Sequence, residues 1–196
     1  MPLAAILTDL DTAGETDGAR QTTARWYWCG VLGELYGEAI ESRFARDLAE
    51  VVEWVKGRRE PITVHDAHFT ANRLLTLQTR NSAAYKGIYA LLMRDGGLDF
   101  LKGILNSART FFDDKIDIHH IFPQAWCKAN SLDDHTYNSI INKATISAAT
   151  NRSTSCKAPS TYLPTLEKRA DIDSARLDTI LSSRRIEPGL LRADDF

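Results

Sequence analysis

The sequence predicts a mainly helical protein whose helices surround one polar segment. Three observations support this prediction. Apolar residues recur at spacings of three and four between Ala24 and Val55, and shorter stripes of the same kind follow as far as Gly97. Residues 113–162 are instead rich in Asp, His, Asn, Ser and Thr, and helical patterns return beyond Pro164.

The elements can be justified in chain order. Residues 8–24 contain many Thr, Asp and Gly residues, and this composition favours a loop. Helices are expected where apolar periodicity meets a cap or a stop signal, namely over 24–55 with a break near Gly37, over 66–77, and from the Asn81–Ser82 cap to Gly96–Gly97. Two brief strands are expected inside the polar segment, over 116–121 and 145–147.

Composition limits the class of protein. The formal net charge of -2 excludes a uniformly basic nucleic-acid coat, so any DNA contact must come from a local patch. The three cysteines form no CxxC pair, which argues against a zinc ribbon and favours a reducing compartment. Neither a signal peptide nor an apolar run of membrane-spanning length is present, so we expect a cytoplasmic protein without a membrane partner.

The polar segment contains the candidate catalytic and metal-binding residues. It includes the run Asp117-Ile118-His119-His120-Ile121-Phe122-Pro123, followed about twenty residues later by Asn142-Lys143 and then by Asn151-Arg152. Phosphodiester hydrolysis requires a base that activates water and positive charge at the phosphate. Histidine suits the base because it titrates near neutral pH, and a second histidine with an Asn oxygen can hold a metal ion.

These motifs resemble the HNH (His-Me finger) nucleases, in the variant whose last motif residue is Asn. The resemblance implies a ββα-metal motif embedded in the helical assembly, with Mg²⁺ or Mn²⁺ as a single divalent cofactor. It assigns His120 as general base, Asn142 as the residue that orients the base, and His119 and Asn151 as metal ligands. Asp117 is a possible further ligand or a partner of one. Asn138 remains the alternative to Asn142.

Most of the chain is similar to the C-terminal part of GmrSD-type restriction proteins, including the effector nuclease of the Ssp phosphorothioate-defence system. The similar stretches are 25–30, 41–44, 80–87, 116–123 and 158–163. In that family, an N-terminal nucleotide-hydrolysing sensor domain with an Asp-Gly-Gln-Gln-Arg motif precedes this region. That motif is absent here, so we expect the chain to be a fragment of a protein that restricts phage or other foreign DNA.

Three regions follow from this interpretation. Residues 1–97 are expected to form a helical scaffold, 98–165 the HNH nuclease core, and 166–196 a helical segment packed on that core. The resemblance implies that the partner is DNA and that one strand is nicked per site. Positively charged residues close to the motif are candidates for phosphate contacts, namely Lys115, Lys143, Arg152 and Lys157.

Other interpretations remain open on the sequence alone. The motif can belong to a degenerate HNH module that only binds DNA or docks a protein, or to a nuclease that acts on RNA. His65 and His68 are three residues apart and can share a helix face, so a second metal site is conceivable, although no third ligand is evident. His135 is expected in a solvated loop.

Overall fold

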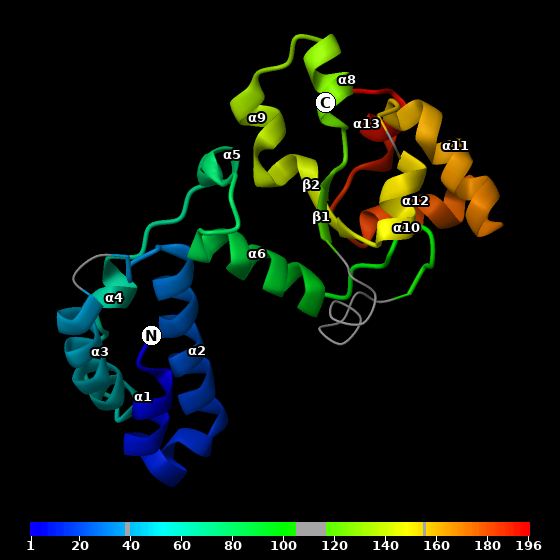
Figure 1. Cartoon of the computed structure of the whole chain (residues 1–196). Coiled ribbons are helices and arrows are strands. Elements are labelled where there is room, and N and C mark those ends of the chain that lie inside the picture. Colours follow the sequence, from blue (N-terminus) through cyan, green and yellow to red (C-terminus); the bar gives the residue numbers. More distant parts are fainter. Residues whose placement is uncertain (38–39, 105–116, 155) are drawn as a thin grey trace. The chain divides into compact units, whose positions relative to one another are not determined.

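The computed structural model describes residues 1–37, 40–104, 117–154 and 156–196, which are mainly helical (Figure 1). The chain divides into two compact units. The first unit comprises Met1–Thr70 and Thr79–Ile88, and the second comprises Ala71–Gln78 and Tyr89–Phe196. No helix among the described residues is both long and apolar enough to span a membrane.

The first unit is a group of helices around one apolar core. Its helices are α1 (Leu3–Leu10), η1 (Asp11–Glu15), α2 (Asp17–Leu32), α3 (Ile40–Val55), α4 (Ile62–His65) and the first part of α6 (Ala83–Arg94). The buried core residues are Ile6, Leu10, Trp26, Val51, Val52 and Val64. The predicted break near Gly37 is confirmed, because α2 ends at Leu32 and α3 begins at Ile40.

Two local predictions for the first 80 residues were wrong. Residues 8–24 are mostly helical, because the Thr16 side chain accepts a hydrogen bond from the Ala19 N–H at 3.2 Å and thereby caps α2. The Thr-rich and Asp-rich composition thus marks a helix start rather than a long loop. The helix predicted over 66–77 is reduced to the single turn α5 (Arg73–Thr76). The helix predicted after Asn81 is confirmed as α6, whose first turn is capped by Ser82.

A buried carboxylate stabilises the first unit. Asp47 on α3 is fully buried and accepts hydrogen bonds from the Tyr36 hydroxyl and, at 2.7 Å, from the Thr63 hydroxyl of α4. Burial is the main reason why the pKa of Tyr36 is raised. Because both carboxylate oxygens have partners, Asp47 links α3, α4 and the segment after α2.

The second unit contains a two-stranded antiparallel sheet and short helices. Strand β1 (Asp117–His120) pairs with β2 (Lys143–Ile146) (Figure 1). In this pairing His120 lies opposite Lys143. The chain segment that connects β1 to β2 contains three short helices, α8 (Gln124–Ala129), α9 (Asp134–Asn138) and η2 (Ile140–Asn142). Helix α10 (Ala148–Thr154) follows β2 almost directly, so the chain order is strand, strand, helix.

The C-terminal helices share a core with this sheet. They are α11 (Pro159–Ala170), α12 (Ser174–Ser182) and α13 (Pro188–Arg192). Their buried residues Leu166, Leu177 and Leu191 belong to the same cluster as Phe122 and Ile146. The predicted boundaries at 98 and 166 remain predictions, since the structure divides the chain only into the two units above.

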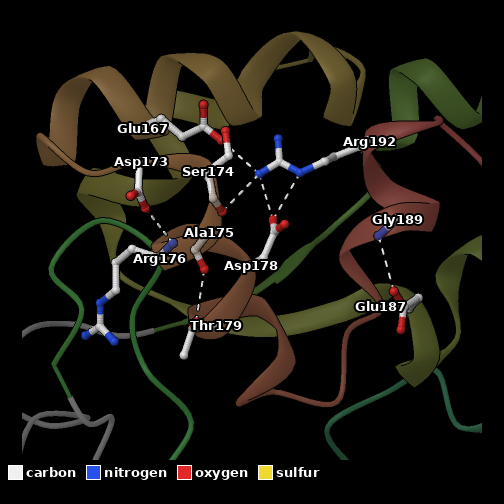
Figure 2. Close-up of polar contacts among 10 residues, drawn as sticks. All are labelled: Glu167, Asp173, Ser174, Ala175, Arg176, Asp178, Thr179, Glu187, Gly189 and Arg192. Carbon is white, nitrogen blue, oxygen red and sulfur yellow. Dashed lines mark hydrogen bonds and ion pairs between the residues drawn. The ribbon is translucent and has the colours of Figure 1, made fainter.

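An arginine connects these three helices. The Arg192 guanidinium donates to Asp178 Oδ1 at 2.7 and 3.0 Å and to Glu167 Oε1 at 2.8 Å, and it also contacts the Ser174 carbonyl (Figure 2). The hydrogen bond with Asp178 is the main reason why the pKa of Arg192 is raised. One side chain of α13 thus holds α11 and α12 together.

Replacing Arg192 should therefore destabilise the second unit. We expect Arg192→Met to lower the free energy of unfolding by about 1–3 kcal/mol, because it removes charge-assisted hydrogen bonds to two carboxylates. Chemical denaturation measures this change. Arg176→Met is the matched control, because Arg176 is an exposed residue of α12 whose guanidinium points away from the cluster in Figure 2. Equal stability of the two variants would contradict this assignment.

Candidate functional site

One cleft in the second unit brings together residues from β1, α8 and α10. Its volume is about 500 Å³. The cleft is lined by His119, His120, Pro123, Gln124, Ala125, Lys128, Asn151, Thr154 and Cys156. It lies at the end of β1, which stops at His120, and beside the helix that follows β2. Three of the predicted site residues, His119, His120 and Asn151, thus lie in one place.

His120 is held by a side-chain amide. Its Nε2 lies 3.2 Å from Asn138 Oδ1, an acceptor, and in the tautomer that carries the proton on Nε2 the ring N–H donates to Asn138. Gln124 Nε2 lies 2.8 Å from the same Asn138 oxygen and 3.4 Å from His120 Nε2. Gln124 therefore donates to Asn138 and supports its orientation. With the proton on Nε2, the lone pair of the neutral ring is on Nδ1.

The surroundings of His120 favour its neutral form. The side chain is half-buried at the end of β1. Burial lowers the pKa of the imidazole below its usual value. The hydrogen bond with Asn138 opposes this shift, while the charges of Lys143 and His119 add to it. A neutral imidazole with one free lone pair is able to accept a proton.

The Asn142 side chain does not contact the His120 imidazole directly, in contrast to the role predicted for it. It is almost fully buried, and its side chain binds the backbone. Asn142 Oδ1 accepts from the Phe122 N–H at 2.8 Å, and Nδ2 donates to the Phe122 carbonyl at 2.9 Å and to the Tyr137 carbonyl at 3.0 Å. The partner of the histidine is Asn138, the alternative that the sequence left open.

The predicted metal ligands come from two elements. His119 is half-buried on β1, opposite Ala144, and Asn151 is half-buried on α10. Both line the cleft, and an imidazole nitrogen with an amide oxygen is a donor set that suits a divalent ion. The backbone of Asp117 pairs with Ile146, but its side chain lies outside the described part of the chain.

Further ligands are needed to complete such a site. Among the residues that the structure describes, no three His, Cys, Asp or Glu side chains form a group that could hold a metal ion. This applies to His65 and His68 as well, which are both exposed in the first unit. The pair His119 and Asn151 would therefore leave several coordination positions to water or substrate, as is usual for Mg²⁺.

The positively charged residues near the motif have different surroundings. Arg152 and Lys157, two of the candidates for phosphate contacts, are exposed, and Lys115 lies outside the described residues. The Lys143 ammonium donates to the Gln78 carbonyl at 2.8 Å, so it holds the segment before α6 against β2. Lys143 is not among the residues that line the cleft.

Sequence reasoning missed Lys128 and Gln124. Both lie on α8, four residues apart, and both line the cleft. Positions i and i+4 of a helix share one face. Pro123 directly precedes α8, and proline is favoured at helix starts, so the run His-Ile-Phe-Pro contained a signal for this helix. Lys128 is the one charged side chain, apart from the histidines, among the described residues that line the cleft.

Comparison with known proteins gives a limited result. No protein-family model matches the chain, and no solved structure does. The chain is similar to an uncharacterized protein of Methanocaldococcus jannaschii, with 28% identity over 144 residues. The match covers 71% of this chain and 24% of that protein. The matched region thus spans about a quarter of the relative's length.

The two asparagines are expected to differ in their effect on stability. Asn142→Ala removes the side-chain partner of the buried Phe122 N–H and of the Tyr137 carbonyl, and each such group left unsatisfied costs about 1–3 kcal/mol. We expect it to lower the free energy of unfolding by about 2–4 kcal/mol. Asn138→Ala removes the contacts of a half-buried side chain with His120 and Gln124 and should change this free energy by less than about 1 kcal/mol. Urea denaturation of both variants checks the difference, and equal destabilisation would contradict the distinct roles of the two side chains.

Proposed function

We propose that this chain is a metal-dependent HNH endonuclease that nicks DNA, and that it forms the nuclease part of a restriction protein. The observation that carries the proposal is the cleft shared by His119, His120 and Asn151. The two histidines lie about thirty positions before Asn151 in the sequence, and all three residues match the motifs of the HNH nucleases. The order β1, β2, α10 also agrees with a ββα-metal motif.

The chemistry follows from the surroundings of His120. With Nε2–H bound to Asn138, the Nδ1 lone pair accepts a proton from water. The oxygen of this water attacks the phosphorus, one P–O ester bond breaks, and its electron pair goes to the departing oxygen, which then takes up a proton from solvent. Mg²⁺ or Mn²⁺ bound by His119 and Asn151 would supply positive charge for the phosphate and the leaving oxygen.

The substrate is proposed to be DNA held through its phosphates. Lys128 lines the cleft, and Arg152 and Lys157 are exposed on the chain segments beside it. None of the described residues lining the cleft is acidic. Contacts to phosphates carry no sequence information. We therefore assign the choice of target to a nucleotide-hydrolysing sensor domain elsewhere in the same polypeptide.

The length of the archaeal relative supports the assignment of cleavage to this chain and of target choice to another domain. That protein is about four times as long as the region it shares with this chain, so the related sequence occurs there within a longer polypeptide. On this basis, the chain by itself should nick modified and unmodified DNA alike and need no nucleotide.

Substitution of the proposed base tests the activity. We expect nicking of supercoiled plasmid with Mg²⁺ or Mn²⁺, its loss in EDTA, and a rate about 10²–10⁴-fold lower for His120→Ala. His68→Ala is the matched control and should retain the full rate, because His68 is an exposed histidine of the first unit. Full activity of His120→Ala, or activity on RNA alone, would contradict the proposal.

The proposed phosphate contact of Lys128 can be tested through the salt dependence of DNA binding. Loss of one phosphate contact should reduce the slope of log affinity against log salt concentration by about one. We expect this change for Lys128→Ala, together with a higher KM and a nearly unchanged kcat. Lys168→Ala, which removes an exposed lysine of α11 that does not line the cleft, should leave both the slope and KM unchanged. Equal slopes for the two variants would exclude a phosphate contact at Lys128.

A further inference from the structure

The start of α10 is attached to a buried carboxylate, and this attachment has a consequence for the cleft. We infer that Asp99 is a positioning residue that holds the first turn of α10 and thereby places the Asn151 side chain. This inference rests on the proposed function, because it assigns Asn151 to metal binding. It adds a residue that belongs to none of the sequence motifs and does not line the cleft.

Among the described residues, the donors to the Asp99 carboxylate come from two segments, residues 101–102 and 147–150. The residue is 1% exposed. Its Oδ2 accepts from the Ser147 N–H at 2.9 Å, and its Oδ1 accepts from the Thr150 hydroxyl at 3.0 Å. Oδ1 also accepts from the N–H groups of Leu101 and Lys102, each at 3.0 Å. The carboxylate therefore joins its own turn to the start of α10.

The same contacts reach the residue next to Asn151. Ser147 caps α10, because its hydroxyl lies 3.2 Å from the Thr150 N–H and 3.0 Å from the Thr150 hydroxyl. Asn151 follows Thr150 directly, and its own N–H donates to the Ser147 carbonyl at 2.9 Å. A shift of Ser147 or Thr150 would thus move Asn151 relative to His119.

Helix α10 needs such an attachment. It has seven residues, and a helix of this length is not stable in isolation, so tertiary contacts must fix its direction. At its other end, Arg169 of α11 donates a hydrogen bond to the Ser153 hydroxyl. Asp99 is thus the anchor at the first turn, and Arg169 is the anchor at the last.

The turn that carries Asp99 is itself held in place. Arg184 donates to the carbonyl of Leu98 and, at 2.6 Å, to the hydroxyl of Thr145 on β2. Burial would raise the pKa of Asp99, but its four hydrogen bonds outweigh burial and lower this pKa, so the carboxylate is charged at neutral pH. A charged acceptor strengthens each of these bonds.

Three variants test the inference. Asp99→Asn puts an NH₂ group where N–H donors converge, and Thr150→Val removes one of these bonds while keeping a side chain of similar size. Asp178→Asn is the control, because it weakens the Arg192 ion pair in the same unit without contacting α10. For each protein we would measure Mn²⁺ affinity by calorimetry with the metal alone, backbone amide hydrogen exchange in residues 148–154, and stability against urea.

The expected results separate positioning from general stability. Asp99→Asn should weaken Mn²⁺ binding by about 10–100-fold and accelerate exchange in α10. Thr150→Val should act in the same direction but less, so the test remains decisive if Asp99→Asn does not fold. Asp178→Asn should lower stability but leave Mn²⁺ affinity and α10 exchange unchanged.

Two outcomes would overturn the role of Asp99 and the proposed function separately. Unchanged Mn²⁺ affinity and unchanged α10 exchange in both Asp99→Asn and Thr150→Val would overturn the role of Asp99 while leaving the nuclease proposal intact. Failure of the unsubstituted protein to bind Mn²⁺ or to nick DNA would overturn the proposed function, and with it the metal-directed role of Asp99. Hydrogen exchange in α10 would then still show whether Asp99 anchors the helix.

Discussion

The candidate site depends first on the buried side chain of Asn142. Its amide binds both the N–H and the carbonyl of Phe122, and the Asn142 carbonyl accepts from the Ile121 N–H at 2.9 Å. These bonds continue the pairing of β1 and β2 beyond the last strand residues and close the long connection between them. His120 directly precedes this closure and α8 directly follows it, so the positions of the histidine, Gln124 and Lys128 all depend on it.

The segment that connects β1 to β2 also binds the C-terminal helix α11. The Tyr162 hydroxyl of α11 donates to the Ile121 carbonyl at 3.0 Å, and Asp99 holds the start of α10. Helices α8 and α10 have six and seven residues, too few for stability on their own. The cleft is therefore built from short elements that are kept in place by buried hydrogen bonds and a shared apolar core.

The two asparagines show why a motif can identify a site but misassign one of its members. Asn138 and Asn142 are four residues apart, and both have the amide that a histidine partner requires. Which amide reaches His120 depends on the turn at Ser139, where α9 ends and η2 begins. This turn leaves Asn138 half-buried beside His120 and buries Asn142. The sequence shows that both asparagines have a side chain able to bind a histidine. It does not show which of the two side chains points toward His120.

The sequence by itself determined the mainly helical class, the break between α2 and α3 and the cap of α6, because periodicity and capping are local properties of the chain. The grouping of His119, His120 and Asn151 in one cleft was predicted by the resemblance of their motifs to the HNH nucleases. Only the tertiary structure decided that Asn138 is the partner of His120 and that the Lys143 ammonium binds the Gln78 carbonyl. It also decided that Lys128 lines the cleft and that Asp99 binds the start of α10. Each of these depends on contacts between residues far apart in the sequence or on the burial of a side chain. Such contacts and such burial are fixed only when the helices pack together.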